Sequence, residues 1–396
     1  MAEATILALN SGSSSLKLGL FAAQFGDLRS LCSGEVEEIG SNQAHFWIRG
    51  ATGEVRSQQN QKVPDQQTAL GIAAGALQGL PFPTPQAVGH RIVHGGPKLL
   101  EHQEITPEVL RELERAAIFA PLHAPAALEI IRQAQQLFPH VPQFACLDTV
   151  FHRTLPETAS RFALPEIFWE AGVRRYGFHG LSCESVLHAL GGDVPQRVII
   201  AHLGSGASIT AVAKGSSVDT TMGLTPAGGI VMGTRPGDLD PGVVLHLLRT
   251  LRGNAAELEK LLDRESGLFG ISGLSSDIRQ LHQAVDNPRA RCAIEIFCRS
   301  ATKAVGSFVT ILRGLDLLIF TGGIGENDAK VREKICAGLE PLGVTLDPQS
   351  NQSNLRTISA INSRVRVFVL PSDENTQIAR HAYRLFLSRT VAGEGA

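Results

Sequence analysis

The chain of 396 residues lacks several features that would assign it to a special environment. Its six cysteines form no CxxC pair and no cysteine-dense segment, which argues against a disulfide-stabilised secreted scaffold. No apolar run approaches the ~20 residues of a membrane span. The first apolar run is broken at Asn10 and has no basic region before it, so it does not resemble a signal peptide. We therefore expect a cytoplasmic protein with reduced thiols and no membrane partner.

The chain also lacks a charge excess, because 36 Lys and Arg residues face 38 Asp and Glu residues, giving a net charge of −2. Such a balance provides no global field for nucleic acid, which we do not expect as a partner. The chain does have a large hydrophobic fraction, 43%, and 40 glycines, above the average of roughly 7%. The length predicts two or three domains, and the glycines predict close backbone approaches.

Strand-like and helix-like segments alternate along the chain, which predicts an α/β fold. Strands are expected in residues 86–96, 141–149, 315–320 and 364–371, and a strand–turn–strand in residues 197–212. Helices are expected in residues 106–119, 289–312, 326–339 and 374–389. The glutamine-rich residues 57–68 are expected to form a solvated insertion.

The first two predicted strands flank an unusual turn, Asn10–Ser15, which is rich in hydroxyls and is followed by Lys17. Glycine and serine are ordinary turn residues, so the turn is either a solvated hairpin or a phosphate cradle of N–H groups, hydroxyls and a lysine. It is not a P-loop, because that motif has Gly directly before Lys and continues into a helix. The turn alone does not decide between the two readings.

A second copy of this turn favours the phosphate reading. The stretches Leu9–Ser14 and Leu203–Ser208 agree at four of six positions, and both connect two predicted strands. They lie about half the chain apart. This spacing predicts two similar domains, each presenting a phosphate-binding hairpin.

Other candidate residues lie at strand ends and in loops. Arg91 and Val93 share one face of their strand, which suits a small anion with a short apolar tail. Asp148 ends a strand, where α/β folds bind their ligands. His179 precedes a glycine, and Arg235 lies in a long loop of Gly and Pro. For each of these residues, an ordinary structural role is the alternative.

Two further motifs have nucleotide and metal readings. Residues 321–327, "TGGIGEN", lack the last glycine of the dinucleotide fingerprint, but their strand–turn–helix setting suits a nucleotide. Asp373 and Glu374 lie at a strand-to-helix junction. They either cap the helix or hold Mg²⁺ through water.

Together these segments resemble the acetate kinase family over nearly the whole chain and in the same order. The resemblance is carried by "NSGSSSLK", "VGHRIVHGG", "LDTVFH", "RRYGFHG", "HLGSGAS", "GTRPGDLDPG", "GGIGEN" and "PSDEN". It implies an α/β fold of two duplicated sugar-kinase/Hsp70/actin-like domains around a central cleft. The N-terminal domain would comprise residues 1–147 with the closing helix 376–396, and the nucleotide-binding domain residues 148–375.

The resemblance also implies an activity: reversible, Mg²⁺-dependent transfer of the ATP γ-phosphoryl group to acetate, giving acetyl phosphate and ADP. Mn²⁺ is the alternative metal, and a homodimer is expected. A carboxylate with a pKa near 4.3 is ionised at pH 7 and needs no general base to attack phosphorus. The difficulty is to bring one anion to another, which requires arginines, Mg²⁺ and N–H donors.

The resemblance implies roles for the individual residues that match the motifs of the family. Catalytic roles are implied for Asp148, His179 and Arg235. Acetate would contact Arg91, with a methyl pocket of Val93, Leu122, Phe178 and Pro226. Mg²⁺ would lie near Asn10 and Glu374. Phosphate and nucleotide contacts are implied for Ser13, Ser15, Lys17, His202, Leu203, Gly204, Ser205, Gly206, Asp277, Ile278, Arg279, Gly323, Ile324, Gly325, Glu326 and Asn327.

The sequence departs from the family pattern at five positions: Ala124, Leu181, Cys183, Ser205 and Asn375. Ser205 stands where the family has asparagine, so the departures concern the phosphate donor most directly. Two alternatives therefore remain open. One is a kinase for propionate or butyrate, or one with a donor other than ATP; the other is a degenerate paralogue that only binds nucleotide.

Overall fold

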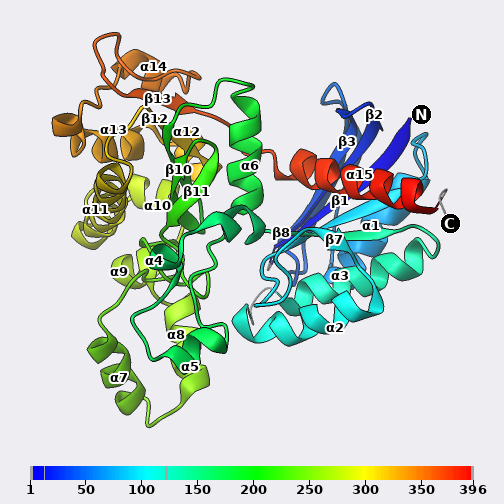
Figure 1. Ribbon diagram of the computed structural model, residues 1–396, viewed down its shortest axis with the longest axis horizontal. Coiled ribbons are helices and arrows are strands. Elements are labelled where there is room, and N and C mark those ends of the chain that lie inside the picture. The colour runs from blue at the N-terminus through cyan, green and yellow to red at the C-terminus, as the bar shows by residue number, and fades with distance from the viewer. Residues whose placement is uncertain (1–2, 13, 121–123, 394–396) are drawn as a thin grey trace. The chain divides into compact units, whose positions relative to one another are not determined.

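The computed structural model describes residues 3–12, 14–120 and 124–393, and their side chains up to residue 389. The chain divides into two compact units (Figure 1). Unit 1 comprises Met1–Val150, Gly180–Ser185 and Asp373–Ala396, and unit 2 comprises Phe151–His179 and Val186–Ser372. Among the described residues, no helix is both long and apolar enough to cross a membrane.

The described residues of unit 1 form an eight-stranded sheet in the order β5-β4-β3-β2-β1-β6-β8-β7. Its strands are β1 (Ala4–Ser11), β2 (Leu16–Gln24), β3 (Asp27–Glu37), β4 (Ala44–Gly50), β5 (Val55–Gln61), β6 (Ala87–Ile92), β7 (Gln103–Glu104) and β8 (Gln143–Leu147). Strands β1 to β5 form an antiparallel meander, whereas β6 runs parallel to β1, and β8 parallel to β6. The carboxyl ends of β1, β6 and β8 therefore meet at one edge.

Helices cover both faces of this sheet (Figure 1). They are α1 (Gln66–Gln78), α2 (Pro107–Ala116), α3 (Ala124–Leu137) and α15 (Glu374–Gly393), with the 3₁₀ turn η1 (Ala117–Phe119) after α2. Helices α1 and α3 bury apolar side chains against one face, and α15 packs against the other. Gly89 permits the close approach of α15, because a Cβ at this position would lie 2.7 Å from Ile378 Cγ2.

The described residues of unit 2 form a five-stranded sheet in the order β11-β10-β9-β12-β13. Its strands are β9 (Arg197–Leu203), β10 (Ala207–Ala213), β11 (Ser216–Thr220), β12 (Leu317–Thr321) and β13 (Arg366–Val369). Strands β9 to β11 are antiparallel, and β12 and β13 continue the sheet in parallel with β9. Residues 197–212 thus form the predicted strand–turn–strand.

The helices of unit 2 are mostly short apart from α11 (Pro288–Ile311), which packs on β9 and β10. The others are η2 (Val150–Thr154), α4 (Glu157–Ser160), α5 (Glu166–Glu170), α7 (Pro241–Thr250), α8 (Ala255–Arg264), α9 (Gly267–Ser272), α10 (Ile278–Gln283), α12 (Gly322–Asn327), α13 (Ala329–Ala337), η3 (Glu340–Leu342) and α14 (Pro348–Gln352). Helix α6 (Gly180–Ala189) is shared, with residues 180–185 in unit 1.

The two sheets repeat one pattern. Strands β3-β2-β1-β6-β8 of unit 1 correspond in order and direction to β11-β10-β9-β12-β13 of unit 2. The prediction of a duplicated α/β fold is therefore confirmed.

Two details of the sequence-based prediction need correction. Residues 57–68 are not an insertion: they contribute to edge strand β5 and to the first turn of α1, capped by Asp65. Asp148 and Glu374 were predicted in the C-terminal domain, but both cluster with unit 1. The reason is that the Asp148 N–H donates to the carbonyl of Ile92 at the end of β6, and Glu374 begins α15.

Candidate active site

In unit 1, the parallel strand ends collect four of the predicted site residues. Asn10 lies near the end of β1, Arg91 in β6, Asp148 directly after β8, and Glu374 at the start of α15. Arg91 donates from Nη2 to Asp148 Oδ2 at 2.6 Å and from Nε to the same oxygen at 2.9 Å. Its Nη1 donates to Asn10 Oδ1 at 3.3 Å, and Asn10 Nδ2 donates to Glu374 Oε2 at 2.8 Å. The four residues thus form one connected cluster.

This cluster is largely buried, which sets its charge state. The side chain of Asp148 is 0% exposed and that of Arg91 is 15% exposed. Burial raises the pKa of Asp148 to about 6, against the opposing attraction of Arg91 and with added repulsion from Glu374. Burial alone would lower the pKa of Arg91, but Asp148 and Glu374 outweigh it and raise that pKa, so the guanidinium stays charged. At pH 7 the cluster therefore has a fixed cation between two carboxylates.

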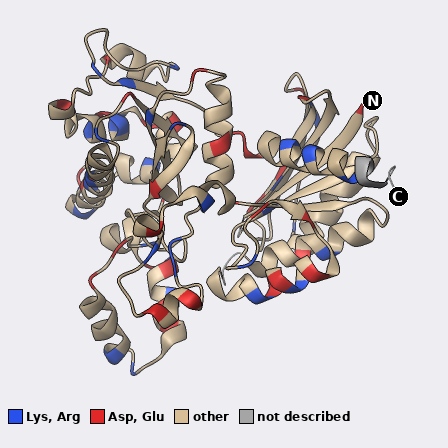
Figure 2. Cartoon of the chain, viewed as in Figure 1, with Lys and Arg blue, Asp and Glu red and all other residues tan. Residues whose placement is uncertain are grey.

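The ion pairs along α2 of unit 1 lack this burial. Figure 2 shows that basic and acidic residues alternate along α2. Arg111 pairs there with Glu108, and Arg115 with Glu112. Three of these four side chains are more than half exposed. Exposed pairs of this kind contribute little and mark no site. Burial therefore distinguishes the Arg91 cluster from the charged pairs along α2.

The cluster has the oxygen donors that a hard divalent cation prefers. Glu374 and Asp148 supply carboxylates, and Asn10 supplies an amide oxygen. Asp148 Oδ1 is buried and has no hydrogen-bond partner among the described residues. An unpaired buried carboxylate oxygen is an unusual feature that a cation would satisfy. The residues present therefore fit Mg²⁺.

The predicted phosphate hairpin connects β1 to β2 beside this cluster. The Gly12 N–H donates to the Ser15 carbonyl at 2.8 Å, and Gln66 Nε2 donates to the Gly12 carbonyl at 2.9 Å. Lys17 is 53% exposed and lies 3.8 Å from Glu35. Ser13 lies outside the described residues. The phosphate roles of Ser13, Ser15 and Lys17 therefore stay predictions.

The predicted methyl pocket is divided between the two units. Val93 follows β6 in unit 1 and is buried, whereas Phe178 and Pro226 belong to unit 2. Leu122 lies outside the described residues.

Among the departures from the family pattern, Leu181 and Cys183 are fully buried. Leu181 packs in the core beneath α15, so this departure from the family pattern affects packing.

In unit 2, two histidines and an arginine surround the turn between β9 and β10. The rings of His179 and His202 stack with centroids 4.1 Å apart, and His179 Nδ1 is 3.0 Å from Ser208 Oγ. A Cβ at Gly206 would lie 3.3 Å from His179 Nε2 and 3.7 Å from Arg235 Nη2. The structure thus brings together His179, His202 and Arg235, which are far apart in the sequence.

The loop that carries Arg235 is fixed by its main chain. Arg235 Nη1 donates to the Pro226 carbonyl at 2.7 Å, and the Gly233 N–H donates to the Ser205 carbonyl at 3.1 Å. The Met232 N–H donates to the Arg235 carbonyl at 3.0 Å. The predicted catalytic arginine therefore sits on a rigid loop joined to the Ser205 turn. A rigid loop of this kind suits a transition-state contact, which needs donors held in place beforehand.

Beside this turn, unit 2 contains a cavity of ≈ 830 Å³. Eight of the predicted nucleotide residues line it: Gly204, Ser205, Asp277, Ile278, Arg279, Gly323, Ile324 and Asn327. Residues that the sequence did not indicate also line it, namely Ser276, His282, Asp328, Ala329, Lys330, Gln352 and Asn354. Ser276 directly precedes the predicted Asp277–Arg279, and Asp328 follows the predicted Asn327 and caps α13, whereas the others have no such signal in the sequence.

Within the glycine motif, not every residue lines this cavity. Glu326 Oε1 accepts hydrogen bonds from the N–H groups of Gly322, at 2.9 Å, and Ser372, at 3.0 Å. Gly322 has φ +76°, and a Cβ there would lie 2.7 Å from the Leu203 carbonyl oxygen. Glu326 therefore fixes the turn between β12 and α12. Its nucleotide contact, like those of Leu203 and Gly325, stays a prediction.

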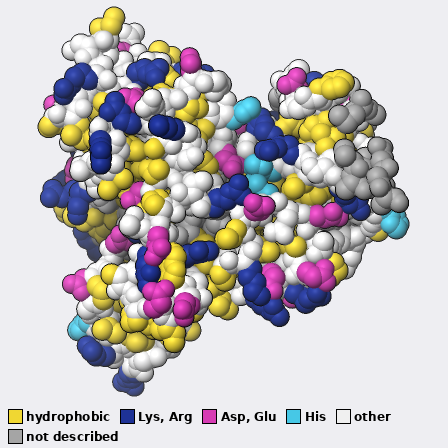
Figure 3. Space-filling view, in the orientation of Figure 1, with side chains coloured by type: hydrophobic (Ala, Val, Ile, Leu, Met, Phe, Trp, Pro, Cys, Tyr) yellow, Lys and Arg dark blue, Asp and Glu magenta, His cyan; other side chains and the backbone are white. Residues whose placement is uncertain are grey.

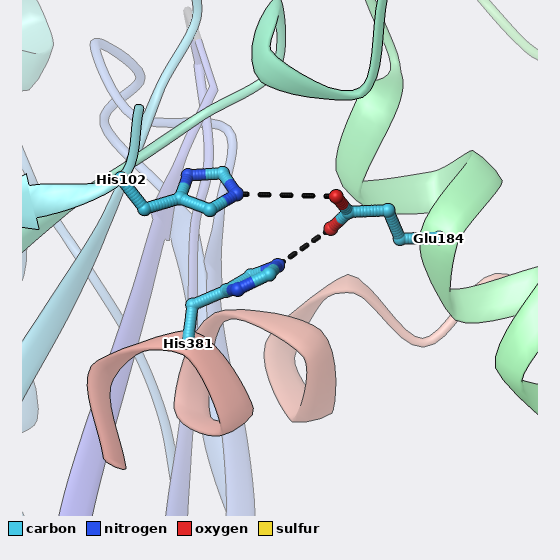
Figure 4. A group of neighbouring side chains, drawn as sticks. All are labelled: His102, Glu184 and His381. Atoms are coloured by element: carbon cyan, nitrogen blue, oxygen red, sulfur yellow. Dashed lines mark hydrogen bonds and ion pairs between the residues drawn. The ribbon is translucent and has the colours of Figure 1, made fainter. Parts of the chain in front are cut away.

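A second cluster of possible ligands lies in unit 1: His102, Glu184 and His381 (Figure 4). Glu184 Oε2 is 2.5 Å from His381 Nε2, and Oε1 is 3.9 Å from His102 Nε2. The Leu147 N–H donates to His102 Nδ1 at 3.0 Å, so a neutral His102 carries its proton on Nε2. A metal would need the lone pair of that nitrogen. The residues therefore fit a hydrogen-bonded cluster and do not fit a metal centre.

The chain is similar to known proteins over nearly its whole length. The model of the acetokinase family matches residues 5–380. A protein named acetate kinase from Nitrobacter hamburgensis is 43% identical, covering 98% of this chain and 97% of its own. A propionate kinase from Citrobacter rodentium is 41% identical, covering 99% of each chain. The crystal structure of Porphyromonas gingivalis acetate kinase matches with a TM-score of 0.83 at 37% identity, covering 97% of this chain and 100% of that one.

Proposed function

The chain belongs to the acetokinase family, and we propose that it transfers the γ-phosphoryl group of ATP to acetate, reversibly, giving acetyl phosphate and ADP. It is thus a phosphotransferase with a carboxyl group as acceptor, on an actin-like fold. The observation that carries the proposal is the buried Arg91–Asp148 pair at the strand ends of unit 1. A fixed guanidinium at this place is suited to hold a carboxylate acceptor.

The acceptor needs little chemical activation. A carboxylate is already ionised at pH 7 and attacks phosphorus without losing a proton. We assign Arg91 to the acetate carboxylate and Asp148, Glu374 and Asn10 to Mg²⁺. The metal, when bound, neutralises charge on the transferred phosphoryl group. Above about pH 6 Asp148 is ionised and able to take part in this site.

The donor site is assigned to unit 2. A cavity of ≈ 830 Å³ accommodates a nucleoside phosphate and is far larger than pyrophosphate requires, which favours ATP among the donors left open by Ser205. His179 and Arg235 beside the Gly206 turn supply donors for the charge that develops on the equatorial phosphoryl oxygens. The transfer reaction requires both sets of residues to act on one phosphoryl group.

Propionate is the second candidate acceptor, because one relative of 41% identity is named propionate kinase. One added methylene changes discrimination by only ~1–3 kcal/mol in an apolar pocket. We expect acetate to be preferred and propionate to be a slower substrate. The assignment of Val93 to the methyl pocket fails if butyrate is used better than acetate.

We also propose that the chain forms a homodimer through unit 2. Helices α5 and α7 expose large apolar side chains, including Ile167 at 67%, Phe168 at 46% and Leu245 at 50%. Figure 3 shows hydrophobic side chains among charged ones at this end of unit 2. Light scattering on the wild type and on Ile167→Asp tests this proposal, since a dimer through this face weakens with the aspartate.

The activity itself is tested by trapping acyl phosphate with hydroxylamine. ATP and Mg²⁺ are supplied with acetate, propionate or butyrate, and pyrophosphate replaces ATP in a parallel series. We expect hydroxamate with acetate and ATP, less with propionate and little with pyrophosphate. ADP binding without any hydroxamate would instead support the degenerate, nucleotide-binding paralogue.

A further inference from the structure

Arg332 in α13 is a buried cation with an unusual set of partners. Its side chain is fully buried, and burial lowers the pKa of its guanidinium. Nε donates to Asn351 Oδ1 at 2.8 Å, and Nη1 donates to the carbonyls of Gly325 and Glu326 at 2.9 and 3.0 Å. Nη2 donates to the Asn351 carbonyl at 2.7 Å and to Asn354 Oδ1 at 2.6 Å. All five acceptors are uncharged, and they match the five N–H groups of a guanidinium.

The carbonyl acceptors lie at the ends of two short helices. Gly325 and Glu326 belong to the last turn of α12, and Asn351 belongs to the last turn of α14. The last carbonyls of a helix have no partner within the helix, and they carry its partial negative charge. A single cation thus satisfies both helix ends at once. This explains how Arg332 is tolerated in the interior.

Both helices contribute walls to the cavity of unit 2. Gly323, Ile324 and Asn327 come from α12, whereas Gln352 ends α14 and Asn354 follows it. Asn354 has φ +50°, a left-handed conformation that its contact with Arg332 helps to hold. Arg332 itself does not line the cavity. It therefore acts on the cavity only through the residues that it holds.

We propose that Arg332 is a positioning residue for the nucleotide, holding the α12 wall and the Gln352–Asn354 wall of the cavity in one fixed arrangement. The inference rests on the proposed function, because it takes the ligand to be a nucleoside phosphate. A lysine retains the charge but has one nitrogen with three N–H groups, so it cannot reach all five acceptors. Holding both walls thus requires the branched guanidinium group with its five N–H donors.

The test uses Arg332→Lys, with Arg299→Lys as a matched control, since Arg299 is exposed on α11 of the same unit. Circular dichroism establishes folding, calorimetry measures ADP affinity, and steady-state kinetics measure KM for ATP and for acetate. We expect Arg332→Lys to weaken ADP binding and raise KM for ATP roughly tenfold to 10²-fold, since a misplacement of about 1 Å costs up to 10²-fold. KM for acetate should stay at the wild-type value, and Arg299→Lys should match the wild type.

A second variant keeps the test decisive if Arg332→Lys does not fold. Asn351 accepts from Arg332 and donates to the Ala329 carbonyl, but it does not line the cavity. Asn351→Ala should weaken ADP binding in the same direction and by less. Unchanged ADP affinity in a folded variant, or equal increases in both KM values, would overturn the proposal. A wild type that binds no ADP would contradict the proposed function instead.

Discussion

In unit 1 the carboxyl ends of β1, β6 and β8 present Asn10, Arg91 and Asp148, whereas the corresponding ends of β9 and β12 in unit 2 present Gly204 and Gly322. The same strand arrangement thus carries a different kind of site in each unit. Buried charges in unit 1 suit a small carboxylate and a metal ion. Glycine turns beside a large cavity in unit 2 suit a nucleotide, which needs space and close main-chain approach.

The largest effect on this difference between the units is expected from removing the cation of unit 1. Arg91→Ala should lower kcat/KM for acetate by roughly 10²-fold or more, because it removes a charge-assisted contact and leaves Asp148 unpaired. Arg91→Lys should rescue poorly, since Arg91 binds Asp148 through both Nε and Nη2. Steady-state kinetics measure the effect, and thermal melting shows whether the variant is folded. Near-wild-type turnover would remove Arg91 from the mechanism.

The matching change in unit 2 is Arg235→Ala. We expect a loss of roughly 10²-fold in kcat, because Arg235 is assigned to the transition state and not to ground-state binding. KM for ATP should change little, in contrast with the Arg332 variant. A change confined to KM, with kcat retained, would move Arg235 from catalysis to nucleotide binding.

The charge state of unit 1 predicts a pH dependence. Asp148 loses its proton near pH 6 in the native protein, and nearer its ordinary pKa of about 3.9 in the unfolded chain. Between these two pH values, ionisation of Asp148 therefore lowers the free energy of unfolding as pH rises. The ionised form, which Mg²⁺ binding needs, is lost as pH falls below about 6.

We accordingly expect the acid limb of kcat/KM to have an apparent pKa near 6. The position of the limb should move little with temperature, because carboxyl ionisation has a small enthalpy. A limb that moves strongly with temperature would indicate a histidine, and would contradict the assignment to Asp148.

The cluster around Glu184 predicts an effect on stability alone. Burial opposes ionisation of Glu184, but the interactions with His102 and His381 outweigh it and hold its pKa well below the usual range. The ionised carboxylate therefore stabilises unit 1 above its usual pKa, and this contribution is lost as pH falls toward the lower native value. Glu184→Gln should lower the unfolding free energy by about 1–3 kcal/mol at pH 7. Added Zn²⁺ that raised the melting temperature of the wild type but not of this variant would contradict the non-metal assignment.

The last prediction is a gain of activity and concerns Ser205, which lines the cavity where the family has asparagine. An amide reaches further than a hydroxyl, and a hydrogen bond to a charged group contributes about 1.5–3 kcal/mol. Ser205→Asn should therefore raise kcat/KM for ATP, at most about tenfold to 100-fold, without changing KM for acetate. No gain with ATP would mean that the neighbouring main-chain groups already perform this role.

Sequence reasoning reached the parts of the site that have local signals. The position of Asp148 directly after a strand was predictable from the strand pattern, and the two hairpins from their repeated turns, while their roles stay predictions. Arg332 left no such signal, since its side-chain acceptors Asn351 and Asn354 lie 19 and 22 residues away and are uncharged. The prediction of an insertion at the glutamine-rich residues 57–68 was wrong, because an edge strand with exposed side chains resembles a solvated loop in composition.

The division of roles between the units is tested most directly by calorimetric titration of ADP into wild type and Arg91→Ala. Unit 2 should bind ADP on its own contacts, so we expect equal affinities in the two proteins, while the variant forms hydroxamate from acetate roughly 10²-fold more slowly. A loss of ADP affinity in folded Arg91→Ala comparable to its roughly 10²-fold loss of activity would contradict the division.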